Sequence, residues 1–145
     1  MSDVNINNEA VNEKAELADY LHRHRHNCCQ AVLCAFADEI GVDKEILFKA
    51  CEGFGGGMAT NQNTCGALSG AVMLAGLKCS DGLLEESGSK PQTYKIVREM
   101  NQRFVEKTGA LLCKDLKGLE TGVMLCSCPD CITAGVEVVQ EVLGL

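Results

Sequence analysis

The stretch TCGALSG, Thr64 to Gly70, places a cysteine behind a predicted helix cap and two glycines inside an apolar run. Each glycine weakens a helix by about 1 kcal/mol relative to alanine, so this helix start needs a structural reason. Gly66 and Gly70 are four residues apart and therefore lie on one face of the helix. With the neighbouring alanines they form a small-residue face. We expect a buried helix over about residues 64–78, whose small-residue face lets other elements approach Cys65 closely.

Helical signals dominate the rest of the chain. Apolar residues recur at spacings of three and four between Leu17 and Ala35, which is typical of helices. A short helix is expected to open at Asp43, and another runs from Pro91 to Thr108 before Gly109, with proline first and glycine last. No alternating β-branched run is bounded by turns, and no Asn-Gly hairpin signal occurs.

Composition agrees with an all-helical protein. Hydrophobic residues make up 46% of the 145 residues, but aromatics only 4%, and tryptophan is absent. The core must therefore be built from Ala, Val, Leu, Ile and Met, which suits packed helices better than sheets. We predict an all-α fold: a compact bundle of about five helices, with residues 1–145 forming a single domain.

Charge and hydropathy exclude several classes of partner. The net charge is −7, which disfavours nucleic acid and anionic membranes, because both require a positive surface. The longest nearly uncharged apolar run, Cys65 to Leu77, is too short to span a bilayer, which needs about 20 residues. The first 20 residues are polar and acidic, unlike a signal peptide. We expect a soluble cytoplasmic protein without membrane insertion.

Ten cysteines are unusual in such a chain. A reducing cytosol would keep them as thiols, so metal binding or thiol redox chemistry is the better explanation than a structural disulfide framework. A favoured N-cap residue precedes three of them: Asn27 before Cys28, Thr64 before Cys65, and Ser127 before Cys128. In the first turn of a helix, unpaired N–H groups and the helix dipole stabilise a thiolate and lower its pKa. These three cysteines are therefore candidates to attack, exchange or bind metal.

Other cysteines and the histidines carry weaker signals. Cys128 and Cys131 form a C-x-x-C whose sulfurs could share a metal or close a disulfide, but no second C-x-x-C completes a zinc module. Interleaved arginines make the HRHRH segment a solvated basic face, although His24 shares a helical stripe with Cys28 and could act as a base. Small buried hydrophobic roles are expected for the remaining helical cysteines: Cys34, Cys51 and Cys79.

Several motifs occur in a recognisable order: NCCQAVLCAF, GFGGGM, the CGAxxG formed by residues 65–70, CKDLKG and CPDCI. On these motifs, which cover nearly the whole chain, the sequence resembles the redox-active protein family labelled C-GCAxxG-C-C, a label that writes the first two signature letters in the opposite order. The resemblance implies a soluble prokaryotic-type protein with four cysteines that act together: Cys28, Cys65, Cys113 and Cys128. Cys29 and Cys131 sit beside two of these positions and could take their place.

Three functions follow. The favoured one is a thiol redox protein, a thiol oxidoreductase, in which Cys65 attacks and Cys28, Cys113 or Cys128 resolves it as a disulfide. The second is an electron-transfer protein that binds an iron–sulfur cluster or zinc through these four cysteines, with Cys131 as a further ligand. The third is a small adaptor or storage protein that uses metal only to hold its helices together. A redox partner is expected, and a homodimer could form through the small-residue face.

Overall fold

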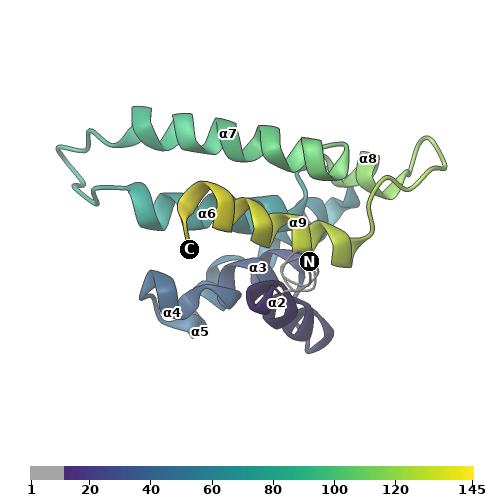
Figure 1. Ribbon diagram of the computed structural model, residues 1–145, viewed down its shortest axis with the longest axis horizontal. Helices are drawn as coiled ribbons and strands as arrows, with labels where there is room; N and C mark the ends of the chain where they lie inside the picture. The colour runs from purple at the N-terminus through teal and green to yellow at the C-terminus, as the bar shows by residue number, and fades with distance from the viewer. Residues whose placement is uncertain (1–11) are drawn as a thin grey trace, which may run out of the picture.

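A computed structural model describes residues 12–145, and this part of the chain is helical, with a single isolated β-bridge and no extended strand (Figure 1). The polar N-terminal stretch that argued against an export signal lies mostly outside the described residues. The longer elements are α2 (Glu13–Arg23), α3 (Cys28–Ala35), α6 (Gly66–Cys79), α7 (Lys90–Thr108) and α9 (Cys128–Val138). Shorter ones are α4 (Ala37–Ile40), α5 (Lys44–Ala50), α8 (Cys113–Lys117), η1 (Glu52–Phe54), η2 (Gly57–Asn61) and η3 (Val139–Leu143).

The all-α prediction is confirmed, but the predicted number of about five helices was too low. Helices α4 and α8 are four and five residues long, and each ends at a glycine in the left-handed conformation, Gly41 and Gly118. Glycine enters that conformation without steric cost, so it ends a helix after a single turn. The periodic spacing of apolar residues can be recognised only over a longer segment than four or five residues, so it does not reveal such short helices.

Local capping signals match the observed helix ends. The Asn27 side chain accepts from the Gln30 N–H, as predicted for an N-cap, and the Gln30 side chain accepts from the Asn27 N–H, so the two form a capping box at the start of α3. The Asp43 carboxylate caps α5 as predicted. Helix α7 carries proline in its first turn and ends at Thr108 before Gly109, also as predicted.

Helix α6 forms the centre of the molecule, between α7 on one side and α3 on the other, with α9 beside it (Figure 1). Its small-residue face is fully buried. A β-carbon on Gly70 would lie 2.8 Å from the carbonyl oxygen of Cys29, and one on Gly135 of α9 would lie 3.0 Å from that of Ala67. The glycines therefore let α3 and α9 pack backbone to backbone against α6. This face is used inside the chain and is not available for the homodimer that we expected to form through it.

None of the described helices combines the length and the apolar character needed to cross a bilayer.

Candidate functional site

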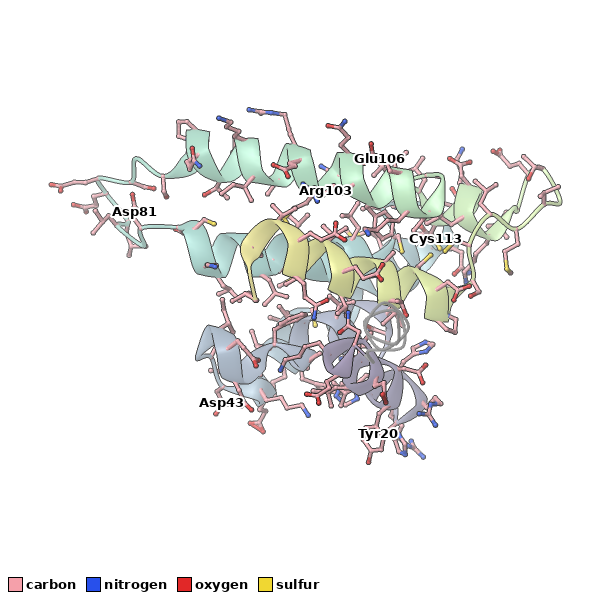
Figure 2. All side chains as sticks on the ribbon, viewed as in Figure 1. Tyr20, Asp43, Asp81, Arg103, Glu106 and Cys113 are labelled. Carbon is pink, nitrogen blue, oxygen red and sulfur yellow. The ribbon has the colours of Figure 1, made fainter. Side chains whose placement is uncertain are left out.

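Six cysteines line one cavity of about 160 Å³ at the end of the bundle where α3, α6, α8 and α9 begin. Four of them are the cysteines singled out in the sequence, and the other two are Cys126 and Cys131. The complete lining is His22, Asn27, Cys28, Gly56, Cys65, Gly66, Cys113, Leu116, Lys117, Cys126, Cys128 and Cys131. Figure 2 shows Cys113 near this end, with other sulfur atoms close to it. None of the ten cysteines is in a disulfide.

The four predicted cysteines all stand at helix starts. Cys28, Cys113 and Cys128 are the first residues of α3, α8 and α9, and Cys65 occupies the N-cap position of α6. The predicted caps Asn27 and Ser127 are confirmed, because each side chain accepts a backbone N–H from the first turn. Four helix N-termini therefore point at one cavity, and their partial positive charges favour negative charge there.

Thr64 is not a helix cap, contrary to the sequence-based prediction. It pairs with Leu112 in an isolated antiparallel bridge, flanked by hydrogen bonds from the Cys65 N–H to the Leu111 carbonyl (2.9 Å) and from the Cys113 N–H to the Asn63 carbonyl (2.7 Å). Because the backbone of Thr64 is held extended by this pairing, the helix begins one residue later. The bridge also fixes Cys65 and Cys113 next to each other at the cavity.

Two glycines make room for the sulfurs. A β-carbon on Gly66 would overlap Cys28 Sγ, and one on Gly57 would lie 2.5 Å from the Cys113 β-carbon. Gly57 belongs to a left-handed turn that runs through Gly56, Met58 and Ala59, all with φ close to +60°. Its glycines let the backbone close over the cavity beside Cys28 and Cys113.

A family model described as "Putative redox-active protein (C_GCAxxG_C_C)" matches residues 26–142. The chain belongs to this family. The match includes every cysteine of the cavity and the CGAxxG motif at its centre. No curated protein and no solved structure gives a significant match to the chain.

Among the cavity thiols of this protein, Cys65 is the one whose surroundings lower its pKa and so favour the reactive thiolate. Hydrogen bonding with the Cys131 thiol is the largest influence and lowers the pKa of Cys65 to about 7, despite the opposing effect of burial. The N–H groups of Ala67 and Leu68 and the charge of Lys117 lower this pKa further. The same contact raises the pKa of Cys131, so the proton of the pair belongs to Cys131 and the negative charge to Cys65.

The expectation of a thiolate at each helix start is wrong for Cys28. Burial raises the pKa of the Cys28 thiol more than the facing N–H of Gly56 lowers it. Burial likewise raises the pKa of Cys113 and of Cys126. A helix N-terminus therefore does not by itself produce a thiolate here; the loss of solvation outweighs it unless a thiol donor such as Cys131 also faces the sulfur.

The cavity has a deep part and a rim. Cys65, Cys113 and Cys131 are 6%, 6% and 3% exposed, whereas Cys28, Cys126 and Cys128 are only partly buried. Cys131 lies between the two parts, because its sulfur is also 3.9 Å from the backbone carbonyl oxygen of Cys126.

Sequence reasoning named Cys131 only as an alternative to the four cysteines or a further metal ligand, and it gave Cys126 no role. Cys131 is three residues after Cys128 and therefore on the same side of α9, a signal that could have placed it in the cavity. Cys126 precedes the cap of α9 and had no periodic signal. It is positioned by a tertiary contact instead: the Leu125 and Cys126 N–H groups both donate to the Leu116 carbonyl of α8, at 2.9 and 3.3 Å.

Cys29 and Cys51 form a second thiol pair away from the cavity. Both are fully buried, and hydrogen bonding between them raises the pKa of Cys29 and lowers that of Cys51. Cys29 therefore does not replace Cys28 at the cavity. Cys51, expected to be only a small hydrophobic side chain, has a thiol partner.

His24 does not reach Cys28, so the predicted base is wrong. Its ring is exposed, stacks on Tyr20 and bonds through Nδ1 to the Tyr20 carbonyl at 2.6 Å. Tyr20 lies on the outer side of α2 (Figure 2). Helix α2 ends at Arg23, so the helical stripe does not continue to residue 28. His22 is the histidine that lines the cavity.

The described side chains do not offer a site for a single metal ion. Among residues 12–145, no three His, Cys, Asp or Glu side chains are arranged so that they could hold a metal ion.

Proposed function

We propose that this protein is a cysteine-based redox protein, a thiol oxidoreductase, whose cavity thiols cycle between thiol and disulfide. The observation that carries the proposal is the contact between Cys65 and Cys131 inside a cavity that six cysteines line. The family description supports redox activity in general. We place the activity in one domain spanning residues 1–145 of a cytoplasmic protein that exchanges electrons with a redox partner.

The proposed reaction begins at Cys65. Its thiolate attacks one sulfur of an oxidant disulfide, forms a mixed disulfide and releases the other sulfur of the oxidant as a thiolate. Cys131 then loses its proton and attacks the Cys65 sulfur, which releases the second oxidant thiolate and leaves a Cys65–Cys131 disulfide. Two electrons pass to the oxidant, and one proton is released from Cys131, because Cys65 enters the reaction as a thiolate. Lys117 and the N–H groups of Ala67 and Leu68 stabilise the charge on Cys65 before the attack.

The other predicted cysteines have supporting roles in this proposal. Cys28, Cys113 and Cys128 lie around the same cavity and provide alternative resolving thiols. Cys131 is the preferred resolving thiol, because it alone among these is in hydrogen-bonding contact with Cys65.

A thiol count tests the proposal. The reduced protein should lose two free thiols on mild oxidation, and peptide mapping should find Cys65 in the disulfide. Cys65→Ser should abolish this loss, whereas Cys79→Ser, at the far end of α6, should leave it unchanged. Equal behaviour of the two variants would contradict the proposal.

A second candidate is an iron–sulfur electron-transfer protein in which Cys28, Cys65, Cys113 and Cys128 hold the cluster, with Cys131 as a further ligand. Helix N-termini on all sides favour it, because their N–H groups can hydrogen-bond to cluster sulfurs. The absence of a three-ligand arrangement among the described residues makes a single zinc ion, catalytic or structural, a poorer fit. Anaerobic purification followed by iron, sulfide and zinc analysis distinguishes these forms: bound iron with visible absorbance would favour the cluster over the dithiol protein.

A further inference from the structure

We propose that Cys65, Cys131 and Cys126 form a three-sulfur relay, which moves a disulfide from the deep part of the cavity to its rim, where a dithiol protein reduces it. This inference rests on the proposed function and adds an exit route for the oxidising equivalents.

The need for a relay comes from the burial of the reacting pair. Thiol–disulfide exchange requires the attacking sulfur to contact the disulfide sulfur directly. Cys65 and Cys131 are 6% and 3% exposed, so a Cys65–Cys131 disulfide is inaccessible to a reductant that carries its own thiol on a folded surface. A disulfide formed at this depth must move before a protein can reduce it.

Cys131 is placed to move it. Its sulfur lies 3.9 Å from the backbone carbonyl oxygen of Cys126, and hydrogen bonding with the thiols of both Cys65 and Cys126 raises its pKa. Cys131 is held by the first turn of α9 through its N–H bond to the Ser127 carbonyl (2.8 Å). Cys126 is held against α8 through the Leu116 carbonyl. The two sulfurs therefore approach each other from separate, fixed pieces of backbone.

The relay step is an intramolecular exchange. Cys126 loses its proton and attacks the Cys131 sulfur of the Cys65–Cys131 disulfide. The Cys131–Cys126 bond forms, the Cys65–Cys131 bond breaks, and Cys65 leaves as a thiolate. No electrons are gained or lost, and one proton is released from Cys126. A thiol with a lower pKa is the better leaving group. The N–H groups of Ala67 and Leu68 and the charge of Lys117 face the Cys65 sulfur, lower its pKa and stabilise it as the leaving thiolate.

Cys126 is the accessible end of the relay. It is only partly buried, and the residues before it are among the most exposed apolar side chains of the described chain: Val123, Met124 and Leu125 at 61%, 61% and 52%. The dithiol reductant attacks Cys126 of the Cys126–Cys131 disulfide, and its second thiol resolves the mixed disulfide. The products are two thiols on this protein and one disulfide on the reductant, so the electrons balance.

The test compares reduction by a large and a small reductant. The full-length protein is oxidised with one equivalent of diamide, the disulfides are mapped by proteolysis and mass spectrometry, and reduction by thioredoxin or by a water-soluble phosphine is followed. The wild type should contain a Cys126–Cys131 disulfide in addition to Cys65–Cys131. In Cys126→Ser and in Cys126→Ala only Cys65–Cys131 should be found. Reduction of either variant by thioredoxin should slow by about tenfold or more, with a smaller change for the phosphine.

Cys79→Ser is the matched control and should behave like the wild type. A Cys65–Cys131 disulfide that thioredoxin reduces equally fast with and without Cys126 would overturn the relay while leaving the proposed function intact. The same holds if Cys126 never pairs with Cys131 in the wild type. Failure to find any disulfide of Cys65 would overturn both.

Discussion

The sulfur of Cys28 lies directly against the α-carbon of Gly66, in the space that a β-carbon at Gly66 would occupy. The same β-carbon would lie 3.0 Å from the Phe54 carbonyl and 3.3 Å from the Cys29 nitrogen. The first glycine of the CGAxxG motif is therefore required by a neighbour from α3, and it brings Cys28 beside Cys65.

Gly66→Ala should destabilise the protein by about 1–3 kcal/mol, because two of its three close neighbours are backbone atoms that cannot move aside easily. Gly76→Ala in the same helix is the matched control, since nothing lies within 4 Å of its added β-carbon. That change should stabilise by about 0.5–1 kcal/mol through helix propensity. Urea denaturation measures both. Similar effects of the two changes would argue against the close packing at Gly66.

Cys65 should be alkylated as a thiolate at neutral pH. With its pKa at about 7, the rate should be half its maximum at about pH 7 and level off about one pH unit higher, whereas an ordinary thiol reaches half its maximum only at about pH 8.5. Cys131→Ala should move this midpoint to higher pH, because the largest influence on the pKa is removed. Iodoacetamide labelling of the Cys65 peptide between pH 5 and 10 provides the measurement. An unchanged midpoint in Cys131→Ala would show that another group stabilises the thiolate.

Ala59, in the left-handed turn beside the cavity, should be conformationally strained, and replacing it with glycine should relieve the strain. Ala59 has φ +64°, a conformation that costs an L-residue about 1–2 kcal/mol and glycine almost nothing. Ala59→Gly should therefore stabilise the fold by about 0.5–1 kcal/mol, after allowing for the greater entropy of glycine in the unfolded chain. Ala50→Gly, exposed in α5, should destabilise by a similar amount. Thermal unfolding of both variants checks the opposite signs; a lower midpoint for Ala59→Gly would contradict them.

Cys29 and Cys51 should resist alkylation in the native protein. Both side chains are 0% exposed, so a reagent reaches them only when the structure opens. Cys79 and Cys128, which are partly exposed, should react without opening. Pulsed labelling with mass spectrometry separates the two classes, and equal labelling rates for Cys29 and Cys79 would refute the assignment.

Local signals in the sequence were reliable wherever the structure depends on neighbouring residues. The caps at Asn27 and Ser127 and the limits of α7 at Pro91 and Gly109 were all predicted correctly, because each depends on groups within a few residues. The cap assigned to Thr64 failed because a long-range pairing with Leu112 holds its backbone extended.

The electrostatic prediction needed the tertiary structure. Helix starts were located correctly at Cys28 and Cys128, but the direction of a pKa shift depends on burial as well as on the helix dipole. At Cys28 burial prevails, and at Cys65 the contact with Cys131 does.

The amino-acid sequence by itself determined an all-α fold, its principal helix ends and the placing of Cys28 and Cys128 at helix starts, since backbone capping and periodicity act over a few residues. Only the tertiary structure decided which sulfurs meet. Cys126, Cys131 and Cys65 come together because α9 packs on α6 and the segment before it is bonded to α8. Packing between elements distant in the chain leaves no mark on local sequence patterns, and so the contacts that give this cavity its chemistry could be read only from the folded molecule.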